Sequence, residues 1–87
     1  MNNANRVELI KSLLEEEFSP EHLEVIDDSA AHIGHAGNTS GAGHFTVKIK
    51  AKDLEGKSRI ESHKSVYKVL DHMIGPDIHA LRIVIVK

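Results

Sequence analysis

The hydrophobic and polar positions along the chain divide it into five predicted elements. In the first element, apolar residues recur every three or four positions from about Asn5 to Phe18, which is the period of one face of an α-helix. Asn5 and Glu8 have the spacing of a capping box at the start of this helix. Ser19-Pro20 ends it, because proline disfavours a helical residue before it. The predicted apolar face consists of Val7, Ile10, Leu13, Leu14 and Phe18.

Two segments on either side of a glycine-rich stretch alternate between apolar and polar residues, as β-strands do. Residues 22–27 alternate weakly and predict a short strand, whereas residues 44–52 alternate cleanly. The second strand is therefore expected to bury one face and to keep a wet, basic face. Its predicted buried face carries Phe45, Val47, Ile49 and Ala51, and its wet face carries Thr46, Lys48, Lys50 and Lys52.

A second helix and a last strand follow a turn around Gly56. Ser58 and Glu61 form a better capping box than that of the first helix, and Gly75-Pro76 is a helix stop. Residues 78–87 are β-branched and apolar on both faces apart from two positions, which predicts a strand inside the sheet. The predicted apolar stripe of the helix is Ile60, His63, Val66, Tyr67, Leu70, Met73 and Ile74.

This order predicts an α+β fold, α-β-β-α-β, in a single domain of residues 1–87 with a flexible loop at about 29–43. The first two strands are expected to pair antiparallel across the loop. The second and third are expected to be parallel, because a helix crosses between them in a right-handed connection. Both helices are expected on one face of a three-stranded mixed sheet, because the lysine face of the second strand has to stay wet.

Composition narrows the possible functions. The chain has 87 residues, of which 40% are hydrophobic and 28% charged, as in globular proteins. With a net charge of −2, the whole chain lacks the excess of positive charge that is typical of nucleic-acid-binding proteins. The lack of cysteine excludes disulfides, thiolate-only metal sites and thiol catalysis. No signal peptide, membrane-spanning run, nucleophile–base pair or pair of catalytic carboxylates is visible, so we expect a cytoplasmic protein that is not an enzyme and does not contact membranes.

Residues 29–44 are rich in histidine and glycine, and they could be a metal site, a phosphate cradle or a flexible connection. The glycines match neither a Walker loop nor a dinucleotide fingerprint. His32 and His35 could each supply a metal ligand. A complete mononuclear site needs three or four groups, so the residues alone favour a flexible loop. His79 adds weight to the metal-site interpretation, because it lies at the start of the last strand, where side chains project toward neighbouring loops.

The second helix carries two further candidates. His63 lies near the middle of its predicted apolar stripe, and we expect a structural core histidine there rather than a ligand. Basic residues cluster at the start of the helix, where a helix N-terminus can bind phosphates. A solvated face is the simpler interpretation of that cluster. The basic residues are Lys57, Arg59, Lys64 and Lys68.

Two motifs resemble the BolA family. Its hallmarks are a histidine flanked by basic residues in the second helix and an Ile/Val-His-Ala motif that starts the last strand. Ser62-His63-Lys64 and Ile78-His79-Ala80-Leu81 correspond to them here. "SPEHLEV" at 19–25 and "GHF" at 43–45 are also similar, and the likeness covers about residues 6–86. The resemblance implies a fold like that of a type II KH domain, in agreement with the predicted order of elements.

The resemblance also implies a function in iron–sulfur cluster assembly or trafficking. BolA-like proteins form heterodimers with monothiol glutaredoxins and share a [2Fe–2S] cluster with them. The glutaredoxin supplies its active-site cysteine and a bound glutathione thiol. The BolA-like partner supplies the histidine of the Ile-His-Ala motif, here His79, and a loop residue, here His32 with His35 as the competing candidate. The isolated protein is then expected to be a monomer.

The alternative that the resemblance implies is a DNA-binding transcriptional regulator of the BolA type, in which Lys57, Arg59, Lys64 and Lys68 contact DNA. Two departures from the family bear on that role: Leu54 stands where an aromatic residue is usual, and Ser62 replaces a basic residue beside His63. The Gly-x-x-Gly clamp by which KH domains hold the RNA backbone is also absent.

Overall fold

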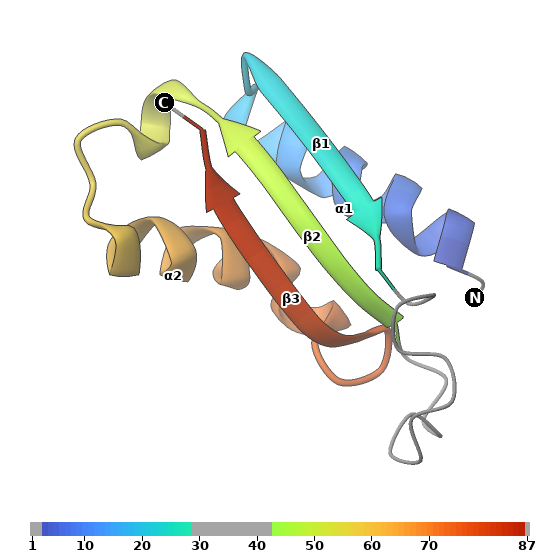
Figure 1. Ribbon diagram of the computed structural model, residues 1–87. Coiled ribbons are helices and arrows are strands. Elements are labelled where there is room, and N and C mark those ends of the chain that lie inside the picture. Colours follow the sequence, from blue (N-terminus) through green and yellow to red (C-terminus); the bar gives the residue numbers. More distant parts are fainter. Residues whose placement is uncertain (1–2, 29–42, 87) are drawn as a thin grey trace.

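The computed structural model describes residues 3–28 and 43–86. Their elements follow the predicted order α-β-β-α-β (Figure 1). The predicted loop at about 29–43 lies outside the described residues except for Gly43, which begins a strand. The elements are α1 (Asn3–Phe18), β1 (His22–Asp27), β2 (Gly43–Lys50), the short 3-10 helix η2 (Lys52–Leu54), α2 (Arg59–Leu70), the 3-10 helix η3 (Asp71–Met73) and β3 (Ile78–Ile85).

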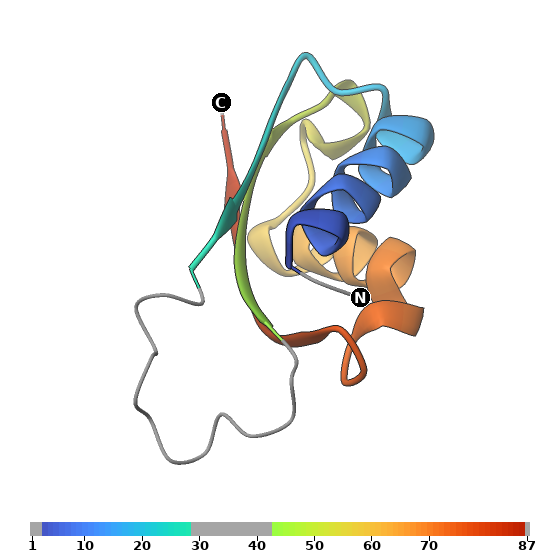
Figure 2. The same cartoon turned by 90° about the vertical axis from the view of Figure 1, so that its right-hand side faces the viewer.

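The three strands form one mixed sheet in the order β1-β2-β3. β1 and β2 are antiparallel, with Asp27 opposite Phe45, and β2 and β3 are parallel, with Phe45 opposite Leu81. Both helices cover the same face of the sheet, as predicted (Figure 2). The prediction that the last strand lies inside the sheet is wrong, since β3 is an edge strand among the strands that the structure describes. Its apolar residues are explained instead by packing against the helices on one face.

The core fills the space between the sheet and the two helices. The predicted buried face of β2 is confirmed, and Phe45 is the only aromatic residue among the buried core residues described. The wet face of β2 is only partly confirmed, because Thr46 is buried and its hydroxyl donates a hydrogen bond to the Asp28 carboxylate. The core residues are Ile10, Leu14, Val25, Phe45, Val47, Ile49, Ala51, Leu54, Val66, Leu70, Met73, Ile78 and Ile83.

α1 begins at Asn3, two residues before the predicted start. Asn5 and Glu8 therefore lie within the helix, and the capping box predicted from their spacing is wrong. The buried residues of α1 are Arg6, Ile10 and Leu14, at the four-residue spacing of one helix face. The charged Arg6 thus occupies a position on the face that packs against the sheet.

The capping box at the start of α2 is confirmed. The Glu61 N–H donates to Ser58 Oγ (3.1 Å), and the Ser58 N–H donates to Glu61 Oε1 (3.3 Å). The helix ends at Leu70, and η3 continues the chain toward Gly75, which has a positive φ of 101°. No helix among residues 3–28 and 43–86 is long and apolar enough to cross a bilayer.

The predicted apolar stripe of α2 is partly wrong. Val66, Leu70 and Met73 are buried as expected, but Ile60 is 68% exposed. The buried face also includes Ser62, so it is rotated away from Ile60. The exposed fractions of Tyr67 and Ile74 exceed one third. His63 is half-buried at the edge of the buried face, which corrects its expected position in the middle of the core; its structural role stays a prediction.

Candidate functional site

The candidate site lies at the end of the sheet where β1 ends and both β2 and β3 begin (Figure 1). His44 is the second residue of β2, and His79 is the second residue of β3. Two backbone hydrogen bonds hold this end together. The Asp28 N–H donates to the His44 carbonyl (2.8 Å), and the Gly43 N–H donates to the Asp77 carbonyl (3.0 Å). The parallel pairing of β2 and β3 therefore places the two histidines next to each other.

The position of His79 depends on an irregularity in the pairing of β2 with β3. Gly43 pairs with Ile78, but the next residue of β2, His44, pairs with Ala80. His79 is thus the extra residue on β3, as in a β-bulge, which bends a strand and turns a side chain away from its regular direction. Ile78 is 1% exposed and belongs to the core, whereas His79 is exposed. The irregular pairing presents His79 at the surface directly beside a core residue.

The rings of His44 and His79 lie side by side at this end. Their centroids are 5.1 Å apart, and their planes make an angle of 55°. Neutral imidazole nitrogens bind borderline metals and replace cysteine on one iron of Rieske clusters. No group of three or more His, Cys, Asp or Glu that could hold a metal is found within the described part of the chain. The pair therefore fits two ligands of a metal centre whose other ligands come from elsewhere.

Sequence reasoning predicted His79 and missed His44 as a candidate. A signal was available: once β2 and β3 are taken as parallel strands, the second residue of each strand lies at the same end of the sheet. His32 and His35, the loop candidates, lie outside the described residues. The described residues that flank 29–42, Asp28 and Gly43, both lie at the end of the sheet that carries His44 and His79.

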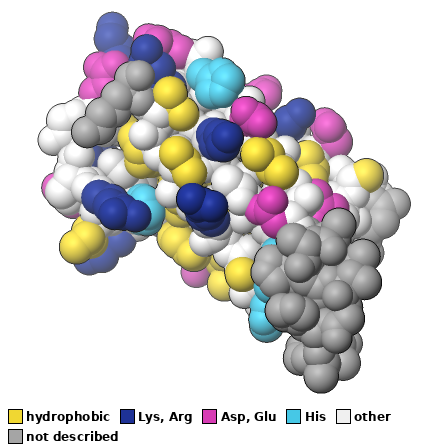
Figure 3. Space-filling view, in the orientation of Figure 1, with side chains coloured by type: hydrophobic (Ala, Val, Ile, Leu, Met, Phe, Trp, Pro, Cys, Tyr) yellow, Lys and Arg dark blue, Asp and Glu magenta, His cyan; other side chains and the backbone are white. Residues whose placement is uncertain are grey.

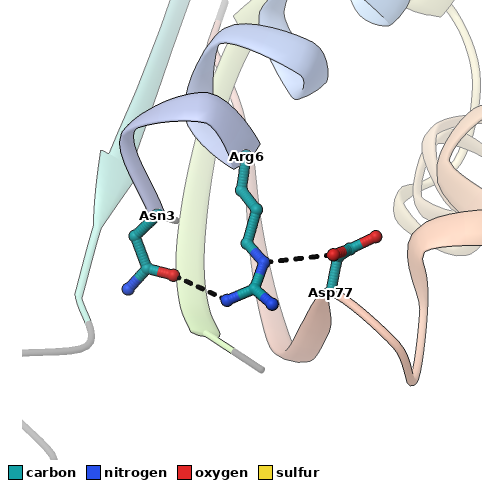
Figure 4. A network of polar contacts seen from close by, with 3 residues as sticks. All are labelled: Asn3, Arg6 and Asp77. Atoms are coloured by element: carbon teal, nitrogen blue, oxygen red, sulfur yellow. Dashed lines mark hydrogen bonds and ion pairs between the residues drawn. The ribbon is translucent and has the colours of Figure 1, made fainter. Parts of the chain in front are cut away.

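A polar network supports the start of β3 (Figure 4). Arg6 Nε donates to Asp77 Oδ1 (3.1 Å), and Arg6 Nη1 donates to Asn3 Oδ1 (2.9 Å). The backbone of Asp77 also donates to the Met73 carbonyl (2.9 Å) and accepts from the Gly43 N–H. Asp77, two residues before His79, therefore joins α1, the end of η3 and the start of β2.

The four basic residues predicted at the start of α2 do not all line one hollow. Lys57 and Arg59 line a groove beside β3. Lys57 also lines a second hollow together with Lys68 and acidic residues, and Lys64, which is exposed, lines neither. The hydrogen bonds of Ser58 lower the pKa of Glu61, with Lys57 and Lys64 adding a smaller electrostatic effect. The acidic residues of the second hollow are Glu16, Glu17 and Asp53.

Comparison with known proteins gives one consistent result. The family model described as "BolA-like protein" matches residues 14–86. "Protein BOLA1, chloroplastic" of Arabidopsis thaliana is 37% identical over 83 residues, which cover 92% of this chain and 52% of that protein. The chain thus spans about half the length of that relative.

Two further comparisons bear on fold and function. The solved "BolA domain of SufE1 from Arabidopsis thaliana" has a TM-score of 0.79 and 38% identity, covering 92% of this chain and 88% of that one. The "DNA-binding transcriptional regulator BolA" of Haemophilus influenzae is 27% identical over 74 residues, which cover 85% of this chain and 69% of that protein. The predicted fold class agrees with the solved structure.

Proposed function

The chain belongs to the BolA family, and we propose that it is a non-enzymatic adaptor that binds a [2Fe–2S] cluster together with a monothiol glutaredoxin and passes the cluster on. The observation that carries the proposal is the pair of histidines at one end of the sheet, with ring centroids 5.1 Å apart. A chain without cysteine needs a partner for the thiolate ligands of such a cluster. In this proposal the glutaredoxin cysteine and glutathione supply them.

His79 is the first proposed ligand, because it is exposed and held at the irregular pairing beside the buried Ile78. The second is His44 or one of the loop histidines, His32 and His35. Histidine ligation leaves a cluster less negatively charged than cysteine ligation and raises its potential. Protons compete with the metal for imidazole near its ordinary pKa of about 6.5. This chemistry suits a cluster that is cargo and has to leave its carrier.

The residues around the pair have separate parts in the proposal. The Arg6–Asp77 contact fixes the backbone just before His79, so the ring is oriented before any metal is bound. His44 is half-buried and is fixed by its strand, so it also loses little conformational entropy on binding. His32 and His35 lie in the glycine-rich stretch and outside the described residues. We therefore expect His79 to contribute most to binding.

Reconstitution with a monothiol glutaredoxin, glutathione, iron and sulfide tests the proposal. Visible absorption and circular dichroism should show a mixed cluster with a spectrum distinct from that of the glutaredoxin homodimer. His79→Ala should abolish this spectrum and leave the far-ultraviolet circular dichroism of the metal-free protein unchanged. His22→Ala is the matched control, since His22 is an exposed histidine at the opposite end of the sheet.

The second ligand is identified in the same experiment. If it is His44, His44→Ala should remove the mixed spectrum, and His32→Ala and His35→Ala should leave it intact. If it is a loop histidine, the loop variants should weaken or alter the spectrum instead. A His79→Ala protein that still forms the wild-type mixed cluster would show that the proposal is wrong.

DNA binding is the second candidate function. It is supported by the name of the Haemophilus influenzae relative and by Lys57 and Arg59, which line one groove. Phosphate-driven binding weakens steeply with salt, by a slope of about −0.9 per phosphate contact. If DNA binds here, Lys57→Ala and Arg59→Ala should each reduce that slope by about one. Lys68→Ala, outside the groove, serves as the control.

A further inference from the structure

A groove runs between the start of α2 and the free edge of β3, and we call it the edge groove. Its volume is about 540 Å³, within the range of about 300–1,000 Å³ that is typical of ligand sites. One wall comes from the start of α2 and the residues before it, and the other comes from the second half of β3. The lining residues are Lys57, Arg59, Ser62, His63 and residues 81–85.

The backbone of β3 points alternately toward β2 and toward the edge groove. The Val86 N–H donates to the Ile49 carbonyl (2.8 Å), so Val86 directs its N–H toward β2. The Leu81 carbonyl instead accepts a hydrogen bond from the Tyr67 hydroxyl of α2 (3.1 Å), so it points away from β2. Because the alternation has a period of two, Ile83 and Ile85 also direct their N–H and C=O groups away from β2.

No described strand pairs with this side of β3. An unpaired strand edge is a template for another extended chain. Tyr67 occupies the outward carbonyl of Leu81, so the part of the edge open to pairing begins after Leu81 and includes Ile83 and Ile85. This segment is the C-terminal half of β3, whereas His79 lies near the start of the strand. A peptide bound to the segment therefore leaves His79 accessible.

The chemistry of the lining indicates what kind of chain fits. The apolar part of the floor comes from Leu81 and Ile85, which are partly buried, and from the buried Ile83 between them. Lys57, Arg59 and Arg82 are exposed around it, and no acidic residue lines the groove. Figure 3 shows basic side chains over the start of α2 and over β3, with a histidine between them. An apolar floor, cationic walls and a free backbone edge together complement an extended, acidic peptide.

We propose that the edge groove binds an extended acidic peptide segment of another protein, which adds to β3 as a fourth strand. Alternate side chains of the peptide pack on the apolar floor, and its carboxylates pair with Lys57, Arg59 and Arg82. This site is separate from the histidine pair and needs no metal.

Two other occupants fit less well. Binding of single-stranded nucleic acid relies on aromatic side chains that stack on successive bases, and the edge groove offers only the imidazole of His63, with no Phe, Tyr or Trp in its lining. A second copy that pairs β3 with β3 would bring the Arg82 side chains of both copies onto one small shared sheet, with no carboxylate in either groove to offset them. Pairing of β3 with the β1 edge of a second copy joins two different surfaces, which leads to rings or open chains of molecules rather than a two-fold dimer.

Fluorescence anisotropy with labelled peptides tests the proposal on the metal-free protein. The probe is an octapeptide of alternating glutamate and valine, compared with one of alternating lysine and valine. We expect saturable binding of the acidic peptide below 1 mM, at least tenfold tighter than that of the basic one. Arg82→Glu should weaken binding at least tenfold, and Lys68→Glu, an equal change of charge outside the groove, should weaken it less than twofold.

Backbone pairing is tested separately with an acidic peptide N-methylated at alternate residues, prepared in both registers. Methylation of the amides that pair with β3 should abolish binding to the wild-type protein, and the other register should still bind. No binding of the acidic peptide at 1 mM, or equal binding of both methylated peptides, would overturn the proposal. So would tighter, Arg82-dependent binding of a labelled oligothymidylate, or a self-association in analytical ultracentrifugation that Arg82→Glu abolishes.

Discussion

Replacing Arg6 by methionine measures how much the network at the start of β3 stabilises the fold. The Arg6 side chain is 9% exposed, and its guanidinium donates charged hydrogen bonds to Asp77 Oδ1 and to Asn3 Oδ1. Methionine is also unbranched and flexible, so it can occupy much of the space of the arginine stem. The substitution therefore removes the guanidinium contacts and leaves most of the apolar packing in place.

The expected cost follows from burial. Hydrogen bonds to charged groups contribute about 1.5–3 kcal/mol, and breaking a fully buried ion pair costs about 3–5 kcal/mol. The Asp77 side chain is 23% exposed, so water partly solvates the carboxylate after Arg6 is removed. We therefore expect Arg6→Met to lower the free energy of unfolding by about 2 kcal/mol. For a domain of this size, that loss corresponds to a fall in Tm of about 8–16 °C.

Urea unfolding followed by far-ultraviolet circular dichroism measures this change, and a double-mutant cycle with Asp77→Asn isolates the pair. The coupling energy between Arg6 and Asp77 should be about 1–2 kcal/mol, within the range for residues in contact. Lys11→Met is the matched control, since it also removes one positive charge from α1 but alters neither bond of Arg6. A loss below about 0.5 kcal/mol for Arg6→Met, or strict additivity in the cycle, would refute the reasoning.

Two further predictions concern local contacts. Ser58→Ala should lower the free energy of unfolding by about 1 kcal/mol in urea titrations, and no change would mean that the capping box does not stabilise α2. The Ser58 hydrogen bonds lower the pKa of Glu61 from 4.5, so the Glu61 carboxylate stabilises the fold fully above pH 4.5 and progressively less as the pH falls through its folded pKa. Glu61→Gln should flatten this part of the stability–pH profile, and an unchanged profile would exclude the contribution of Glu61. Gly43→Ala should cost about 1–3 kcal/mol by the same titration, because its Cβ would lie 2.7 Å from Phe45 Cζ; a wild-type value would show that the ring moves freely.

The sequence predicted most of the fold because its main signals are local. Strict alternation in β2 identifies the face that carries Phe45 as the buried one, because with a period of two every apolar residue of the strand lies on that face. The Ser58–Glu61 capping box forms because both partners lie within one helical turn. The Asn5–Glu8 box fails although its spacing is the same. α1 starts at Asn3, before the predicted cap, and its first turns include the contact of Arg6 with Asp77, which is 71 positions away in the sequence. No local pattern encodes such a contact.

The face that α2 buries shows a second limit. Apolar residues lie on more than one side of this helix, so periodicity alone fits several orientations. The packing against the sheet selects the face with Ser62 and Val66 and leaves Ile60 exposed. The small Ser62 side chain is 1% exposed, a position that hydrophobicity does not indicate. The same rotation moves His63 from the predicted core to the wall of the edge groove.

Only part of the candidate site was predicted, because local patterns again do not determine how distant segments pack. His79 follows from the motif at the start of the last strand, but its partner ring depends on the register between β2 and β3. Register is a property of two segments that are distant in sequence. Without it, His44 looks like the first residue of an alternating strand and nothing more.

The irregular pairing at His79 links the site to the core. Ile78 and Ile83 are five residues apart, so in a regular strand their side chains would face opposite sides of the sheet. Both belong to the buried core, because the extra residue between Ile78 and Ala80 reverses the alternation. The feature that exposes His79 is therefore the same one that lets both isoleucines pack against the helices. Substitutions of the His79 side chain should spare the fold for this reason. Deletion of residue 79 would place Ile78 and Ile83 four positions apart in a regular strand, on the same face of the sheet, so it should keep both in the core and remove only the proposed ligand.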